Sequence, residues 1–207
     1  LGKLRSALGR INPSIPEAVR EDALKQVQRL NSPELISNNE TFHRMLTEGI
    51  KVNYQQDGNP RGDLVWLIDF ETPENNDFII VNQFTIIENG VNKRPDVLLF
   101  VNGIPLVVIE LKNAADENAT LKSAFKQVET YKAMIPSLFN YNGLLVISDG
   151  LEAKMGSLSA GLSRYMAWKT ADGLGEASHL VSQMETLIKG MLNKETLLDL
   201  IRHFVVF

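Results

Sequence analysis

The chain has 207 residues, with 21 basic and 25 acidic side chains, a formal net charge of −4 and no cysteine. This length suits one sizeable domain, or one domain with a small helical appendage. No apolar stretch approaches the ~20 residues of a transmembrane helix, and the lack of cysteine excludes a disulfide framework and a thiolate zinc site. These features favour a cytoplasmic protein. The negative charge gives no overall attraction for nucleic acid, so such contacts would need local basic groups, a metal or a partner's charge.

Helical spacing of apolar residues and runs of β-branched residues predict the elements in chain order. The first half is expected to hold helices over residues 14–30 and 40–48, then strands over 63–69 and 78–88. The second half is expected to hold a β-hairpin over 96–112, a helix over 114–135, a buried strand over 143–148, and two helices after residue 180, the second capped by Asn193.

This order of elements indicates an α/β fold, a mixed β-sheet flanked by helices, with extra C-terminal helices. We expect an N-terminal helical segment (1–37), a core (38–170) and C-terminal helices (171–207). The sequence starts at Leu1 instead of methionine and stops within the apolar run 202–207. We therefore expect a piece of a longer polypeptide.

Two carboxylates and a lysine converge on the predicted hairpin. Asp96 precedes its first apolar run, and Glu110 and Lys112 end its second. If residues 102–104 form a three-residue loop with Gly103 in the left-handed region, the antiparallel register places Asp96 opposite Glu110. Opposed residues point to one face with Cβ atoms ~4.5–5.5 Å apart, and Lys112 shares that face. Alternate side chains then enter the core on the other face: Val107, Ile109 and Leu111.

Two opposed carboxylates among valine, leucine and isoleucine repel each other unless a cation lies near them. Hard oxygen ligands favour Mg²⁺ or Mn²⁺, which would activate a water and stabilise charge on a phosphate, with Lys112 assisting. Glu40 is a further candidate as a third carboxylate ligand, although it equally suits a helix dipole. The alternative is a set of exposed salt-bridge partners at strand ends. The joint pattern favours a metal-dependent phosphodiesterase site.

The amino-acid sequence around these residues resembles that of a known protein family. Asp96, Glu110 and Lys112 resemble the pattern of the PD-(D/E)xK nuclease superfamily. This resemblance implies a restriction-endonuclease-like mixed β-sheet flanked by helices. Residues 94–106 (RPDVLLFVNGIPL) and 108–113 (VIELKN), with Gln127-x-x-x-Tyr131, resemble the N-terminal nuclease domain of the restriction (R, or HsdR) subunit of type I restriction-modification enzymes. The resemblance covers roughly residues 38–169.

The resemblance implies roles for two further residues, Gln127 and Tyr131. Gln127 and Tyr131 lie four apart on the predicted helix, hence on one face, and would act with the catalytic residues by positioning DNA or the lysine. The alternative is an exposed glutamine and a core tyrosine. Arg94 and Lys154 are candidates for DNA binding through phosphate contacts.

The resemblance also implies a larger machine. The full-length R subunit would continue into an ATP-dependent motor, assemble with methyltransferase (M) and specificity (S) subunits, and cut unmodified double-stranded DNA after translocation. The glycines of the segment 156–161 are not followed by the lysine of a Walker A motif, so ATP belongs to the full-length subunit alone. Two alternatives remain open: a stand-alone repair nuclease or junction resolvase of the same superfamily, and a non-catalytic assembly module that docks the motor onto the methyltransferase.

Overall fold

The computed structural model describes residues 1–113, 120–205 and 207. Its centre is a five-stranded mixed sheet with the strand order β3–β6–β7–β8–β9. In this sheet β7 and β8 run parallel, and the other neighbours are antiparallel. The expected mixed α/β architecture is confirmed. The strands are Phe78–Asn82 (β3), Val97–Val101 (β6), Ile104–Leu111 (β7), Leu144–Ser148 (β8) and Ala153–Gly156 (β9).

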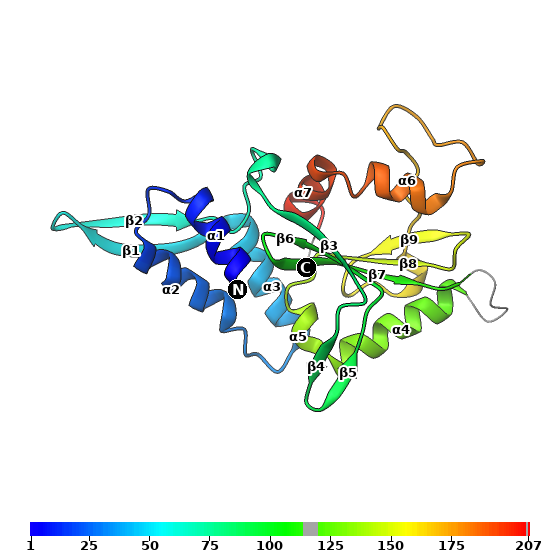
Figure 1. Cartoon of the computed structure of the whole chain (residues 1–207), viewed down its shortest axis with the longest axis horizontal. Coiled ribbons are helices and arrows are strands. Elements are labelled where there is room, and N and C mark those ends of the chain that lie inside the picture. The colour runs from blue at the N-terminus through cyan, green and yellow to red at the C-terminus, as the bar shows by residue number, and fades with distance from the viewer. Residues whose placement is uncertain (114–119, 206) are drawn as a thin grey trace.

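Helices cover both faces of the sheet, which explains why its central strands are almost wholly apolar. Figure 1 shows α4 (Leu121–Met134) below the sheet, and α6 (Gln183–Gly190) and α7 (Lys194–His203) above it. The short helix α5 (Pro136–Phe139) follows α4 directly. The α4 face buries these sheet side chains: Leu98, Val108, Leu145 and Ile147. The opposite face buries these: Leu99, Val107, Ile109 and Val146.

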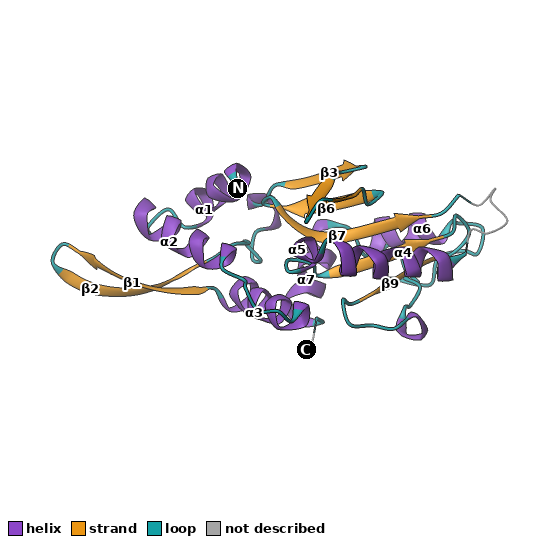
Figure 2. Cartoon of the chain, turned by 90° about the horizontal axis from the view of Figure 1, so that it is seen from below, coloured by secondary structure: helices purple, strands orange, loops and turns teal. Residues whose placement is uncertain are grey.

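The N-terminal part holds three helices and a two-stranded ribbon. The helices are α1 (Gly2–Ile11), which was not predicted, α2 (Glu17–Gln28) and α3 (Leu35–Glu48). Their buried residues join the cluster that packs on the α7 face of the sheet. The ribbon pairs β1 (Ile50–Gln56) with β2 (Asn59–Val65) and projects away from the body (Figure 2). The strand predicted over 63–69 is therefore shifted toward the N-terminus.

The strand predicted over 78–88 is interrupted. Gln83 has a φ of 52° and ends β3. The chain then forms a separate hairpin of β4 (Ile86–Glu88) and β5 (Val91–Lys93). A left-handed residue breaks an extended ladder because its backbone turns away from the pleat.

The remaining predictions concern helix ends. The first six residues of the helix predicted over 114–135 lie outside the described residues. Helix α4 begins at Leu121, and the Thr120 hydroxyl accepts a hydrogen bond from Ser123 N (3.1 Å) as its cap. The predicted cap of α7 is confirmed, because Asn193 Oδ1 accepts from Thr196 N at 2.9 Å.

Within the described parts of the chain, no helix has the length and apolarity needed to span a membrane.

Candidate active site

The turn that joins β6 to β7 contains two residues, Asn102 and Gly103. Their φ angles are 54° and 83°, and Val101 pairs with Ile104 across the turn. Asparagine and glycine at two positive φ angles are the preferred residues of such tight hairpins. The predicted three-residue loop is therefore wrong, because Ile104 already belongs to the ladder.

An irregularity in the hairpin restores the predicted register. Phe100 pairs with Pro105, but Leu99 pairs with Val107, so Leu106 is an extra residue on β7. A β-bulge of this kind shifts the pairing by one position. The last pair of the ladder is Val97 with Ile109. The next residues outward are Asp96 and Glu110, so the two carboxylates lie across from each other as predicted, by a different route.

The same level of the sheet continues through β8 and β9. Glu110 pairs with Ile147, and Ile147 pairs with Lys154. Paired residues of neighbouring strands share a face, and Ile147 belongs to the cluster under α4. Asp96, Glu110 and Lys154 therefore occupy one row on the α4 face, with Lys154 two strands beyond Glu110.

Glu110 is a buried carboxylate with one oxygen satisfied. The residue is 3% exposed, and its Oε1 accepts from Lys112 Nζ at 2.7 Å. Its Oε2 is buried and, among the described residues, has no hydrogen-bond partner of ordinary geometry, although the Tyr131 hydroxyl lies near the carboxyl group. Burial raises the pKa of Glu110, the contact with Lys112 opposes this, and the nearby Asp96 charge adds to the rise. An unpaired buried carboxylate oxygen is costly, and a cation would remove the cost.

Asp96 is held by two neutral donors. Its Oδ1 accepts from Gln83 Nε2 at 2.7 Å, and its Oδ2 accepts from the backbone N–H of Leu111 at 2.8 Å. Each carboxylate oxygen has a second acceptor direction. Asp96 can therefore also bind a cation beside Glu110, and hard oxygen donors of this kind suit Mg²⁺ or Mn²⁺.

At the end of β7, the side chain of Lys112 lies at the site and the side chain of Leu111 is exposed to solvent. The Lys112 side chain is 27% exposed, so its ammonium group can reach both Glu110 and an arriving ligand. Val107 and Ile109 are buried in the opposite cluster as predicted. Leu111 is 42% exposed, so its predicted burial is wrong. The reason is that β6 begins only at Val97, so Leu111 pairs with Ser148 of β8 but has no ladder partner on the β6 side.

Helix α4 carries Tyr131, which lies near Glu110, and Gln127, which lies near Tyr131. Burial raises the pKa of the Tyr131 hydroxyl, the Glu110 charge raises it further, and an interaction with Gln127 lowers it. The hydroxyl also donates a long hydrogen bond (3.5 Å) to the carbonyl of Arg94. Gln127 therefore reaches the site through Tyr131. Arg94 itself is exposed at the start of the hairpin, and Lys154 pairs with Glu152 at 3.1 Å.

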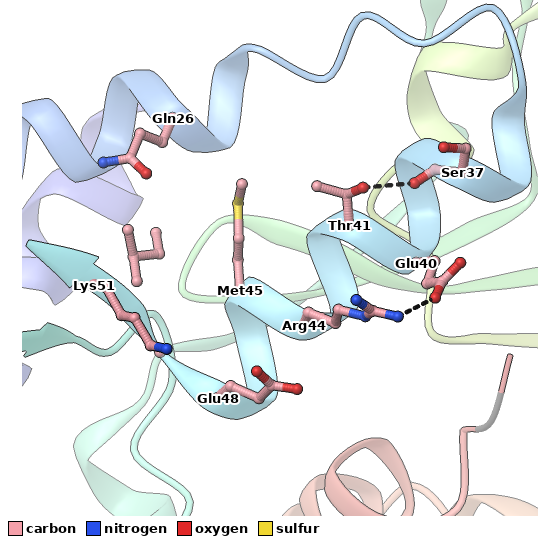
Figure 3. A pocket seen from close by; sticks show the side chains of 10 residues that line it. Gln26, Ser37, Glu40, Thr41, Arg44, Met45, Glu48 and Lys51 are labelled. Atoms are coloured by element: carbon pink, nitrogen blue, oxygen red, sulfur yellow. Dashed lines mark hydrogen bonds and ion pairs between the residues drawn. The ribbon is translucent and has the colours of Figure 1, made fainter.

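The structure does not bring Glu40 to this site. Figure 3 shows it on α3, in an ion pair with Arg44 (2.5 Å), within a pocket formed with α2 and β1 that also includes Gln26 and Lys51. Among residues 1–113, 120–205 and 207, no group of three or more His, Cys, Asp or Glu side chains lies together. Glu40 is thus not part of one acidic cluster with Asp96 and Glu110.

Replacing Glu110 with glutamine is expected to raise the melting temperature at neutral pH, without divalent metal, by about 2–4 °C, or about 1 kcal/mol. A carboxyl group with a raised pKa in the folded state destabilises the fold while it is charged, and protonation on acidification removes that cost. The difference in melting temperature between the variant and the native protein should therefore shrink as the pH falls through the raised pKa of Glu110.

Thermal unfolding between acidic and neutral pH measures this difference. Glu185→Gln is a matched control, because Glu185 is exposed and pairs with Lys189 on α6, and it should give no such gain. If the Glu110→Gln variant melts no higher than the native protein at neutral pH, the charged carboxylate of Glu110 does not destabilise the fold and the prediction is wrong.

Comparison with known proteins decides the family. A family model described as the type I restriction enzyme R protein N terminus (HSDR_N) matches residues 1–164. The chain belongs to this family. It is 42% identical over 208 residues, 99% of this chain, to the type I restriction enzyme HindI endonuclease subunit of Haemophilus influenzae. It is 31% identical over 219 residues, 97% of this chain, to a Methanocaldococcus jannaschii protein provisionally named type I restriction enzyme MjaIXP endonuclease subunit.

The chain spans about a fifth of the length of these two relatives, 20% and 21%. The resemblance inferred from the motifs is thus confirmed, and the chain is the N-terminal region of a type I restriction enzyme R subunit. Sequence reasoning missed the contact of Gln83 with Asp96. The signal was the polar interruption Asn82-Gln83 within an otherwise apolar run, which was read as continuous strand.

Proposed function

We propose that this R-subunit region is a metal-dependent endonuclease domain that hydrolyses phosphodiester bonds of double-stranded DNA, with Mg²⁺ (or Mn²⁺) as its metal. The observation that carries the proposal is the buried Oε2 of Glu110, for which the described residues supply no hydrogen-bond donor of ordinary geometry, on a residue that lies across from Asp96. A cation held by both carboxylates would satisfy that oxygen. The ion would supply positive charge that activates the attacking water and stabilises the charge developing on the phosphate.

The protein's own residues have separate tasks in this proposal. Asp96 and Glu110 hold the metal, and Glu110 must be deprotonated to do so. Lys112 is a charged donor beside the carboxylates, and its partial exposure lets it neutralise a phosphate oxygen or orient the water. Gln127 and Tyr131 act as positioning residues, because Tyr131 lies near the charge of Glu110 and Gln127 interacts with Tyr131.

Phosphate contacts of the DNA are proposed at Lys154 and Arg94. Lys154 lies in the same row as the two carboxylates, so a strand that crosses the site along this row would meet it. Arg94 is exposed two residues before Asp96. With a net charge of −4, the chain depends on such local groups for DNA affinity.

The complete protein is proposed to act within a larger assembly. By family, residues 38–170 would be the nuclease core, followed in the full-length subunit by an ATP-dependent motor. The assembled cytoplasmic enzyme would include methyltransferase (M) and specificity (S) subunits and would cut unmodified DNA after translocation. The names of the relatives, which are endonuclease subunits of type I restriction enzymes about five times as long, support this reading.

Both alternatives have less support. A stand-alone repair nuclease does not account for a family match and alignments that cover nearly the whole chain. A purely structural docking module does not account for the buried, unpaired carboxylate oxygen of Glu110. Such an oxygen destabilises the fold, and a module without catalytic activity has no need of it. Cleavage by the assembled enzyme with Glu110 replaced tests both together.

The 207-residue chain alone is expected to cut DNA weakly or not at all. It has a negative net charge and few basic groups near the site, so it lacks the sustained DNA contact that a motor would supply. Conversion of supercoiled plasmid to the nicked form, followed with Mg²⁺ and with EDTA, measures this. Strong Mg²⁺-dependent nicking by the isolated chain would contradict the dependence on the rest of the subunit.

A further inference from the structure

We infer that Gln83 is a positioning residue that fixes the Asp96 carboxylate for metal binding. This inference rests on the proposed function of the site. It assigns a task to a residue that lies outside the PD-(D/E)xK pattern and directly after β3, apart from the hairpin that carries Asp96 and Glu110.

Gln83 faces Asp96 across the sheet. The β3–β6 ladder ends with the pair Asn82 and Val97, and the next residues outward are Gln83 and Asp96. The backbone N–H of Gln83 donates to the Asp96 carbonyl at 2.8 Å, which adds one further bond to the ladder. The row that holds Asp96, Glu110 and Lys154 thus begins at Gln83 and reaches all five strands of the sheet.

The side chain of Gln83 makes a second bond to the same residue. Its Nε2 donates to Asp96 Oδ1 at 2.7 Å, while Leu111 N donates to Oδ2 at 2.8 Å. Two donors at opposite oxygens of one carboxylate fix the rotation of its plane. The free acceptor directions of Asp96 are then fixed relative to the unpartnered Oε2 of Glu110.

The chemistry of the donor suits a metal ligand. A lysine or arginine at position 83 would supply positive charge to Asp96 and compete with a cation for it. An amide orients the carboxylate through a hydrogen bond and leaves its negative charge for the metal. Neutral outer partners of this kind hold metal ligands in place in other proteins.

The backbone of Gln83 is unusual for a residue without such a task. Its φ of 52° is in the left-handed region, which glycine and asparagine adopt more readily than glutamine. Gln83 is also exposed, so core packing does not select its side chain. Gln83 is thus an exposed glutamine in an unfavourable conformation, with its backbone bonded to the carbonyl of Asp96 and its side chain bonded to the carboxylate of Asp96. This combination points to Asp96 as the reason for its identity.

The test is Gln83→Met in the complete R subunit, since methionine keeps the length of the side chain and removes the amide donor. Mn²⁺ binding to the nucleotide-free subunit is measured by calorimetry, with Asp96→Asn as the blank for this site. The assembled enzyme is then assayed for cleavage over a range of Mg²⁺ concentrations. We expect about tenfold weaker metal binding and a matching rise in the half-saturating Mg²⁺ concentration, with the cleavage rate largely recovered at saturating metal.

Gln55→Met is the matched control, because it makes the same chemical change at an exposed residue of β1 and should leave metal binding unchanged. If Gln83→Met binds Mn²⁺ as the native subunit does while Asp96→Asn loses binding, the positioning role is overturned and the metal site stands. If Asp96→Asn binds Mn²⁺ as the native subunit does, the proposed metal site itself is overturned.

Discussion

Replacing Glu110 with alanine in the complete R subunit is expected to lower DNA cleavage by the assembled enzyme at least about 10³-fold. A metal ion at a phosphoryl group contributes several kcal/mol of transition-state stabilisation, and each 1.36 kcal/mol is a factor of ten in rate. Removing one of two carboxylate ligands forfeits most of that contribution. It also removes the ion-pair partner of Lys112, whose Nζ lies 2.7 Å from Glu110 Oε1 in the native chain.

Cleavage and translocation must be measured separately to interpret this variant. The substitution should leave ATP-driven translocation intact, because the proposed motor lies outside this chain. Linearisation of a plasmid by the assembled enzyme reports cleavage, and ATP hydrolysis on the same DNA reports the motor. Cleavage at the native rate by Glu110→Ala would refute the assignment of the active site.

Glu40→Ala is the matched control for the loss of a carboxylate. Glu40 pairs with Arg44 in a separate pocket and belongs to no acidic cluster with the site among the described residues. We expect this variant to cut DNA at the native rate. A loss of cleavage as large as that of Glu110→Ala would restore Glu40 as a metal ligand.

Replacing Asn102 with alanine is expected to destabilise the folded chain by about 3 kcal/mol, and so to lower its melting temperature by about 6–12 °C. Asn102 is fully buried, and its amide group donates to Leu67 O (2.9 Å) and to Asn76 Oδ1 (2.8 Å). Its Oδ1 accepts from Asp77 N at 2.8 Å. Alanine would leave these buried groups unpaired and would also be strained at a φ of 54°.

A second turn separates these two effects. Asn89 occupies the same turn position in the β4–β5 hairpin, with a φ of 50° followed by Gly90, but it is exposed. Asn89→Ala should therefore carry only the backbone cost, about 1 kcal/mol. Thermal unfolding of both variants gives the comparison. Equal losses of stability would show that the buried hydrogen bonds of Asn102 contribute nothing.

The active-site hairpin illustrates how far the sequence alone could predict the structure. The period-two pattern and the Asn-Gly turn placed Asp96 opposite Glu110, and they placed Glu110 and Lys112 on one face. The loop length was wrong by one residue, and the bulge at Leu106 compensated for it. A bulge leaves no mark in an apolar run, because valine, leucine and isoleucine fit either register.

Contacts between distant segments were beyond prediction for a different reason. The interruption of the strand at Gln83 depends on its contact with Asp96, 13 residues away, which local propensity does not record. The exposure of Leu111 depends on where the neighbouring strand begins. The location of Glu40 depends on how α3 packs, since a helix-borne carboxylate near the site and one in a remote pocket share the same local pattern.

The residues proposed for the site, the hairpin that carries Asp96 and Glu110, and the family of the chain could all be predicted from the amino-acid sequence. These follow from side-chain type and spacing, which are local properties. Three features depend on the folded chain: one oxygen of Glu110 is buried with no hydrogen-bond partner of ordinary geometry among the described residues, Tyr131 lies near that carboxylate, and Gln83 holds Asp96. Burial and hydrogen bonding depend on the packing of α4 and of neighbouring strands, and packing is settled only when the whole chain has folded.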